Sequence, residues 1–247
     1  SSASAAMLFK KAKTTFDYSF KNGFSTIHEY VYRIKIYKKE GLSQANFRVP
    51  YYIGYENLNK DVVKFSDAVT YNLENGKIIK TKLNNEGSFK EDVNDYWAQA
   101  TITMPNVKVG SILEFKYVLK TEAIINFPVF DFQEEIPVNY AEYKTEIPGF
   151  YNYKTVLLGS IKVNSDSKLA SGSQNYTDEH NQSQSFNYSQ SNNVYSAENV
   201  PALVQEIYVD NIENYKSLLQ NELQSKQFNK DPRKDYSLTW DGVAKTI

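Results

Sequence analysis

The chain has 247 residues and a formal net charge of −1, with 28 Lys and Arg against 29 Asp and Glu. This balance argues against a nucleic-acid-binding protein, which usually carries a clustered excess of basic residues. The chain contains no Cys, which excludes disulfide bonds, thiolate metal sites and a cysteine nucleophile within it.

Aromatic residues make up 15% of the chain, with 20 Tyr and 14 Phe. Aromatic side chains favour pleated, half-buried surfaces, so the composition predicts a mainly β protein. No stretch approaches the roughly 18 consecutive apolar residues of a membrane helix, and we expect no membrane span. Residues 1–6 are small and polar and lysines follow soon after, which is not the pattern of a secretory signal. Because no Met opens the chain, we expect a mature or trimmed fragment.

The first strands are predicted by residues that alternate in character. In residues 25–37, every second position from 28 to 36 holds either His28 or an aromatic or aliphatic residue. This alternation indicates a strand with one face on a core. Residues 38–41 then predict a turn. In residues 62–71 the same spacing places four side chains on one face: Val63, Phe65, Val69 and Tyr71.

An Asn75-Gly76 pair follows between two strand-like runs. Asn-Gly supplies the two positive-φ residues of a type I′ turn, so the pair predicts a hairpin with residues 77–83 as its return strand. Residues 97–104, 140–147 and 151–163 predict further strands. Residues 111–121 show the clearest alternation of all, with Leu113, Phe115, Tyr117 and Leu119 facing inward. Regular short strands separated by turns predict a β-sandwich.

Composition changes at residue 164. Residues 164–199 are rich in Ser, Asn and Gln and predict a polar excursion or an irregular hairpin within the sandwich domain, with short strands near 185–188 and 194–196. Residues 214–228 fit a helix stripe or a strand face, and we favour the strand. Residues 239–247 resemble a helix start capped by Thr239. We therefore expect a sandwich domain over 1–238 and the start of a truncated domain at 239–247.

The sequence lacks the common catalytic motifs. His28 and Glu29 begin like a zinc-protease helix, but Tyr32 occupies the place of the second His, so we expect His28 to pack on a strand face. We expect His180 to be a solvated loop residue. The carboxylate pairs Glu134-Glu135 and Asp92 with Asp95 could serve a glycosidase, although neighbouring acidic residues are usually only solvated. We expect no cofactor and no metal ion.

Several aromatic residues could form an exposed platform that stacks on sugar rings or on a partner protein. These residues are Tyr51, Tyr52, Tyr55, Trp97, Tyr151 and Tyr153. The alternative is packing in the core and between strands, where aromatic pairs also stabilise sheets.

A set of stretches, in this order and spacing, resembles a known family. They are residues 33–41 (RIKIYKKEG), 71–77 (YNLENGK), 104–117 (MPNVKVGSILEFKY), 130–133 (FDFQ) with 136–138 (IPV), and 199–203 (NVPAL) with Asn214-Tyr215. Together they are similar to the uncharacterised N-terminal domain that precedes transglutaminase-like domains in secreted or envelope proteins of Bacteroidetes. The resemblance covers residues 7–247. One departure is Phe130, where members often carry Trp.

The resemblance implies an immunoglobulin-like, antiparallel β-sandwich with few short helices, followed by a papain-like fold with a Cys-His-Asp triad. The triad cannot be carried over, because the chain has no Cys and neither His lies in a matching motif. We therefore expect no enzyme activity from this fragment, although the longer protein could be a transglutaminase-like enzyme. The implied location is secreted, periplasmic or in the cell envelope of a bacterium, after removal of a signal peptide.

Three functional hypotheses follow. The first is a non-catalytic accessory module that positions or presents a substrate or partner to a downstream transglutaminase-like domain, which belongs to the cysteine protease or peptidase class. The second is a carbohydrate- or peptide-binding module with its own aromatic surface. The third is a hydrolase in its own right, which would need carboxylates that converge in a pocket.

Overall fold

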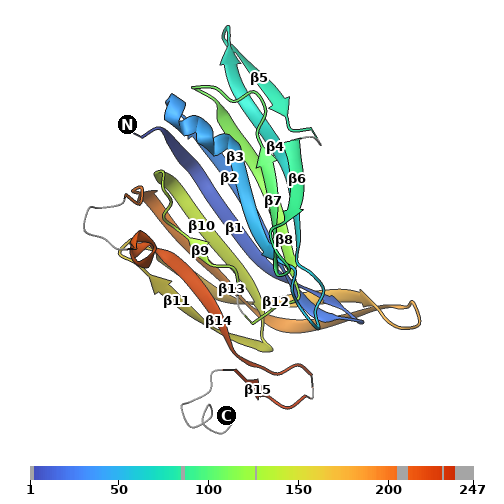
Figure 1. The fold of residues 1–247 in the computed structure, drawn as a ribbon. Coiled ribbons are helices and arrows are strands. Elements are labelled where there is room, and N and C mark those ends of the chain that lie inside the picture. Colours follow the sequence, from blue (N-terminus) through green and yellow to red (C-terminus); the bar gives the residue numbers. More distant parts are fainter. Residues whose placement is uncertain (1–2, 85–86, 126, 205–210, 230, 237–247) are drawn as a thin grey trace.

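The computed structural model describes residues 3–84, 87–125, 127–204, 211–229 and 231–236. The prediction of a mainly β, sandwich-like fold is confirmed (Figure 1). The described helices are short 3₁₀ helices, η1 (Lys39–Ala45) and η3 (Ile212–Tyr215). The turn expected at 38–41 is therefore the start of η1. None of the helices in the described ranges has the length and apolar character that a membrane crossing requires.

One large sheet of eight strands forms the base of the molecule. Its neighbours are antiparallel except for one parallel pair at its centre, β1 with β10. In spatial order the strands are β12 (Asn164–Thr177), β13 (Ser183–Val200), β10 (Val138–Pro148), β1 (Ala5–Ser19), β2 (Gly23–Ile36), β8 (Ile112–Thr121), β4 (Val62–Glu74) and β5 (Lys77–Lys82).

Two smaller sheets cover the inner face of the large one. Side chains from all three sheets meet in one buried core, including Tyr32, Ile102 and Leu219. The first small sheet is β3 (Asn46–Tyr52), β7 (Trp97–Thr103) and β6 (Ser88–Asp92). The second is β11 (Tyr151–Leu158), β14 (Leu218–Lys226) and β15 (Lys234–Asp235), with β9 (Phe130–Asp131) paired to β14.

The alternation predicted for β2 and β8 is confirmed. Tyr30 and Tyr117 stack across the strand pair with ring centroids 4.5 Å apart, and Tyr32 stacks on Phe115 at 5.1 Å. Such cross-strand aromatic pairs fix the register of a sheet, because a slip of one residue would turn every ring to the opposite face. The strand expected within 214–228 is also present, as β14.

The prediction for the inner face of β4 is half wrong. Val63 and Phe65 face the core, but a bulge between Ser66 and Val69 shifts the register. Because one extra residue inverts the alternation, Thr70 is buried after the bulge in place of Val69. The type I′ hairpin is present as predicted, with φ of 50° at Asn75 and 77° at Gly76.

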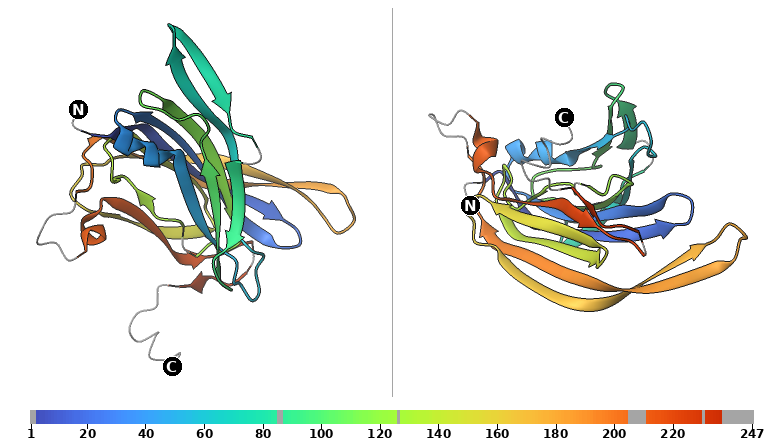
Figure 2. Two further views of the ribbon diagram at one scale, coloured as in Figure 1. Left: turned by 45° about the horizontal axis from the view of Figure 1, so that its top comes forward. Right: turned by 90° about the horizontal axis from the view of Figure 1, so that it is seen from below.

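The polar stretch 164–199 was expected to be a polar excursion or an irregular hairpin with short strands near 185–188 and 194–196. Both of these short strands lie within one long strand, β13, but the hairpin is regular where an irregular one was expected. β12 and β13 form a regular hairpin, paired without interruption from Asn164↔Ser196 to Thr177↔Ser183. Backbone hydrogen bonds form this ladder regardless of side-chain polarity, and an edge strand exposes its side chains to water. The hairpin continues past the end of β10 and curves away from the body of the sheet (Figure 2).

Strand β1 was not predicted, because its inward positions do not form an apolar row. They include Lys10, Ala12, Thr14 and Phe16, of which Lys10 is only 5% exposed. β1 lies at the centre of the large sheet and joins its two halves through β2 and β10. The predicted start of a second domain at 239–247 lies outside the described residues.

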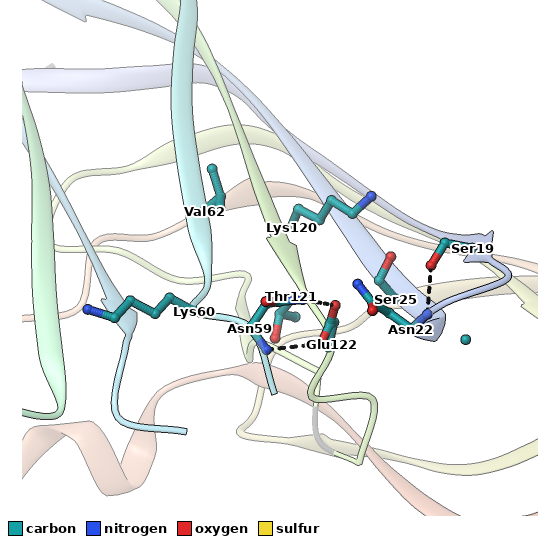
Figure 3. Close-up of a pocket in the computed structure, with 10 residues that line it drawn as sticks. Ser19, Asn22, Ser25, Asn59, Lys60, Val62, Lys120, Thr121 and Glu122 are labelled. Carbon is teal, nitrogen blue, oxygen red and sulfur yellow. Dashed lines mark hydrogen bonds between the residues drawn. The ribbon is translucent and has the colours of Figure 1, made fainter. Parts of the chain in front are cut away.

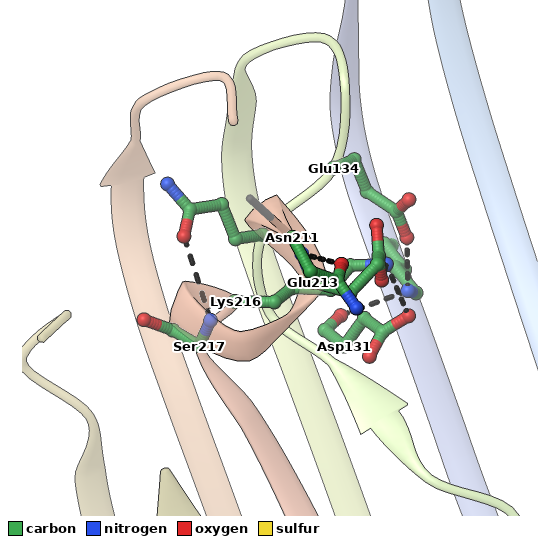
Figure 4. A network of polar contacts seen from close by, with 8 residues as sticks. Asp131, Glu134, Asn211, Glu213, Lys216 and Ser217 are labelled. Carbon is green, nitrogen blue, oxygen red and sulfur yellow. Dashed lines mark hydrogen bonds and ion pairs between the residues drawn. The ribbon is translucent and has the colours of Figure 1, made fainter. Parts of the chain in front are cut away.

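A polar network connects β1 to the second small sheet (Figure 4). The Lys10 ammonium donates to the carbonyl oxygen of Asp131 at 2.8 Å, forms an ion pair with Glu134, and lies 4.9 Å from the ring centroid of Phe130. Lys216 Nζ lies 2.9 Å from the Asp131 carboxylate. A buried charge is costly unless it is paired, so these contacts determine where β9 sits above β1.

We expect Lys10→Met to lower the free energy of unfolding by about 2 to 3 kcal/mol, because it leaves the Glu134 carboxylate without its partner. Lys13→Met is the matched control. Lys13 pairs with Glu146 at 2.6 Å, but both side chains are a third or more exposed, so the loss should stay below about 1 kcal/mol. Urea denaturation measures both. Equal losses would contradict a special role for Lys10.

Candidate functional site

The described residues hold no group of three or more His, Cys, Asp and Glu side chains that could bind a metal ion. Of the carboxylates singled out by the sequence, Glu134 is paired with Lys10, whereas Glu135, Asp92 and Asp95 are exposed. The structure does not bring these carboxylates together in a pocket.

His28 lies on the inner face of β2 and is 1% exposed. Its Nδ1 is 2.8 Å from Thr14 Oγ1, which is also 2.8 Å from Tyr143 Oη, and its Nε2 is 2.9 Å from Thr26 Oγ1. Because Thr26 donates to the carbonyl of Thr121, we assign the proton to Nε2, and Thr14 then donates to Nδ1. Burial lowers the pKa of His28 to about 3. The ring is therefore a neutral core residue, as expected from the sequence.

A cluster of aromatic rings lies at one end of the sandwich, centred on Phe228. The Phe228 ring centroid is 5.1 Å from that of Phe150, 5.3 Å from Phe24, 5.8 Å from Phe186 and 5.9 Å from Tyr18. These residues come from β1, β2, the β10–β11 turn, β13 and the segment after β14. Phe228, Phe150, Phe186 and Tyr18 are only half-buried, so the cluster is also a surface.

Two grooves flank this cluster, and Tyr18 and Phe228 line both. The first, which we call the hairpin-side groove, has a volume of about 790 Å³ and is open toward β12 and β13. Its aromatic lining continues onto the hairpin with Tyr176 and Tyr188, and its polar lining consists of uncharged side chains: Asn187, Ser189, Gln227 and Asn229.

The second, which we call the loop-side groove, has a volume of about 740 Å³. Tyr55 and Leu58 line it from the loop after β3, and Tyr151 lines it from β11. Unlike the hairpin-side groove, it also has a charged lining: Glu122, Lys226, Asp231 and Lys234.

A small pocket of about 260 Å³, lined mostly by polar residues, lies next to the loop-side groove (Figure 3). Contacts between its lining residues fix the loop that carries Tyr55 and Leu58. Asn59 donates to the Glu122 carboxylate twice, from its backbone N–H at 3.0 Å and from Nδ2 at 2.7 Å. Partial burial alone would raise the pKa of Glu122, but these hydrogen bonds hold it below its usual value. The charged carboxylate thus ties the loop to the end of β8.

The structure divides the aromatic residues singled out by the sequence into separate places. Tyr51 faces the main core, and Tyr151 and Tyr153 belong to the aromatic end of the sandwich. Tyr52 packs against Tyr55 at 4.7 Å and against Trp97 at 5.2 Å, both in edge-on geometry. The six residues do not share one flat platform, but Tyr55 and Tyr151 line the same groove.

Sequence reasoning missed most rings of the grooves, including Tyr18, Phe150, Tyr176, Phe186 and Phe228. One signal was available on the hairpin, where Phe186 and Tyr188 are spaced by two and share a strand face in an otherwise polar stretch. No comparable signal marks Phe228, which follows the end of β14.

The chemistry of this end of the molecule suits binding. Burial raises the pKa of the Tyr151 phenol, and that of Tyr55 is also raised mainly by burial, so neither ring supplies a phenolate near neutral pH. Aromatic faces and amide groups offer stacking and hydrogen bonds without a nucleophile. Fold and site together define a mainly β, sandwich-like domain with an aromatic surface that lines two grooves.

Residues 23–187 match a family described as a domain of unknown function with solved structure, DUF3857. The chain belongs to this family. No curated protein matches the chain.

The chain is also similar in structure to a putative protease from Parabacteroides distasonis ATCC 8503, with a TM-score of 0.64 and 13% sequence identity. The match covers 90% of this chain and 41% of that protein, so the chain corresponds to less than half of its length. At 13% identity, the similarity shows that the two proteins share a fold in this region.

The buried, neutral His28 predicts a pH-dependent stability. Its pKa is about 3 in the folded protein, against an ordinary value of 6.5 for an exposed imidazole, so the unfolded chain takes up a proton first as the pH falls. The contribution is complete above about pH 6.5 and is lost as the pH falls toward 3. We expect His28→Leu to be less stable at pH 7 and to lose less stability between pH 6.5 and 4 than the unmodified protein.

Urea denaturation at a series of pH values measures this difference. His180→Gln is the control, because the His180 side chain is 73% exposed, and it should keep the full pH dependence. Parallel curves for His28→Leu and the unmodified protein would contradict the assignment.

Proposed function

We propose that this chain is a non-catalytic accessory domain of a longer protein with a transglutaminase-like, cysteine-protease-type domain downstream. In this proposal the sandwich positions or presents a substrate or partner for that domain. The observation that carries it is the similarity of nearly the whole chain to less than half of a putative protease. The lack of Cys in the chain is consistent with a catalytic thiol elsewhere in the longer protein.

The grooves around Phe228 provide a surface on which a substrate or partner could be held. The loop-side groove combines rings with Glu122, Lys226, Asp231 and Lys234, and such a mixture can contact both the side chains and the charges of a polypeptide. The short strand β15, which runs up to Asp235, lies beside it, since Lys234 is part of the lining. A polypeptide held here would be close to the last described residues of the chain.

The family resemblance seen in the sequence supports a secreted, periplasmic or envelope location for the longer protein. Fractionation of the producing cells, with an antibody raised against this domain, tests the location.

We expect the isolated chain to be inactive on peptide and protein amides, and we expect its removal from the longer protein to reduce cleavage of large substrates. The reduction should appear in KM more than in kcat, because positioning a substrate is a binding effect. Turnover of a short fluorogenic peptide should change little. Steady-state kinetics on both substrates provides the measurement.

Phe228→Ala in the longer protein should also raise KM for large substrates. We expect a rise of roughly tenfold, which corresponds to about 1.4 kcal/mol of lost binding free energy. Phe89→Ala is the matched control, since Phe89 is 49% exposed on β6, which belongs to the other small sheet. Amide hydrolysis by the isolated chain, traced to its own residues, would overturn the proposal.

A second candidate function is a carbohydrate-binding module, favoured by the hairpin-side groove. All of its lining side chains are uncharged, and rings alternate there with Asn, Gln and Ser. Neutral sugars are bound by stacking on aromatic faces together with hydrogen bonds to amides and hydroxyl groups.

In this case the isolated chain should be retarded in native gels that contain a neutral polysaccharide. Tyr176→Ala should reduce the retardation, while Tyr96→Ala should not, because Tyr96 is an exposed ring outside the groove. Unchanged migration in every neutral polysaccharide tested would exclude this candidate and leave the accessory role as the proposal.

A further inference from the structure

The hairpin of β4 and β5 exposes aliphatic side chains at one edge of the large sheet. Leu73 is 73% exposed, Ile78 is 67% exposed and Ile79 is 40% exposed. Leu73 and Ile78 are directly paired across the two strands, so they lie side by side on the same face. The hairpin projects beyond the rest of the molecule (Figure 1).

This aliphatic pair continues into an apolar groove of about 430 Å³ on the outer face of the large sheet. Leu8, Tyr71 and Ile112 form its floor together with the pair. The two small sheets pack on the opposite, inner face, so nothing in the described part of the chain covers this surface. We call it the outer apolar face.

The surroundings of the outer apolar face are basic. The basic residues that line the groove, lie on β5 or flank the hairpin tip are Arg33, Lys35, Lys77, Lys80, Lys82 and Lys108, and the acidic residues beside them are Glu74 and Glu114. Further along β4, Asp67 is paired with Lys116 of β8. Both acidic residues are engaged, Glu74 with Lys108 at 2.6 Å and Glu114 with Arg33 at 2.6 Å. Within the described ranges, Lys77, Lys80 and Lys82 lie in no ion pair. A local excess of positive charge thus surrounds the face in a chain whose net charge is −1.

The two edges of the large sheet differ in a way that edge protection does not explain. Lysines on an edge strand discourage pairing with other chains, and this accounts for lysines on β5. It does not account for a contiguous aliphatic surface between them. The opposite edge, β12, is rich in Ser, and the large aliphatic side chain that it exposes is Leu169.

We propose that the outer apolar face docks on an anionic lipid surface. In this arrangement Leu73 and Ile78 enter the boundary between headgroups and acyl chains, while the lysines around them meet the phosphates. A few aliphatic side chains bind a bilayer only weakly, and a ring of basic residues supplies the second attraction that stable docking needs. Ile78, Lys80 and Lys82 are spaced by two on β5 and so share one face, which places both kinds of contact on one short strand.

This inference goes beyond the accessory role and is independent of it. The hairpin tip and the aromatic grooves lie at opposite ends of the molecule, since β15 borders the loop-side groove and lies far from β5 (Figure 1). A molecule docked through the hairpin would therefore hold its grooves away from the lipid surface.

The test is flotation of the 247-residue chain with vesicles of phosphatidylcholine alone and with vesicles that contain about 30% phosphatidylglycerol. We expect binding to the anionic vesicles and little to the neutral ones. We also expect the binding to be largely lost in about 1 M salt, where the screening length falls to about 3 Å.

Two variants test the two attractions separately. Lys80→Gln with Lys82→Gln should weaken binding by about 25-fold, given about fivefold for each lysine near an anionic surface. Leu73→Ser with Ile78→Ser should weaken it to a similar degree. The matched controls on the opposite edge are Lys168→Gln and Leu169→Ser, which alter equally exposed residues and should bind as the unmodified chain does.

Equal binding to neutral and anionic vesicles would overturn the proposal, as would equal losses in the β5 variants and the β12 controls. Absence of vesicle binding would overturn it as well. If in that case Leu73→Ser with Ile78→Ser converts a dimer into a monomer in size-exclusion chromatography, the outer apolar face is an interface between copies of this chain. Unchanged melting temperatures show that the variants are folded, because all of the altered side chains are exposed.

Discussion

Strand β1 is the element on which the rest of the structure depends. It pairs antiparallel with β2 on one side and parallel with β10 on the other, and so joins two halves of the large sheet that are far apart in sequence. A parallel pair needs a long connection between its strands, and here the connection runs from β2 through β9 and builds the first small sheet on the way. Without β1, the halves carrying β2 and β10 would have no common hydrogen-bonded neighbour.

The inner face of β1 is polar, and this shapes the core around it. Thr14 connects Tyr143 on β10 with His28 on β2, and Lys10 reaches the segment that contains Asp131 and Glu134. Buried polar groups contribute to stability only when their partners are in place, so these contacts specify one arrangement of strands more strongly than apolar packing would. The sandwich is thus held in register by polar contacts at its centre and by aromatic pairs on β2 and β8.

The contacts that hold the strands in register leave the two ends of the sandwich available for binding. At one end, rings from four separate segments gather around Phe228 because β1, β2 and the β12–β13 hairpin all extend past the main core. At the other end, the β4–β5 hairpin carries Leu73 and Ile78 beyond the sheet. Both ends expose apolar side chains next to polar or charged ones. The proposed accessory role and the proposed lipid contact use different ends of the same sandwich.

The sequence by itself determined the mainly β character, the strands around Tyr30 and Tyr117, the Asn75-Gly76 hairpin and the buried position of His28. Each of these follows from local rules, namely side-chain alternation and turn chemistry, which act over a few residues. Part of the site was also within reach, since Tyr55 and Tyr151 were singled out and line one groove.

The tertiary structure alone decided the strand β1, the inverted face of β4 after Ser66, the full length of the β12–β13 hairpin and the gathering of rings around Phe228. The physical reason is the same in each case. A lysine can face the core only because its partner, 121 residues further along the chain, comes to lie above it, and no local pattern contains that information. The bulge in β4 and the polar ladder of β12 and β13 likewise depend on the strand that lies beside them, and the local sequence does not reveal which strand that is.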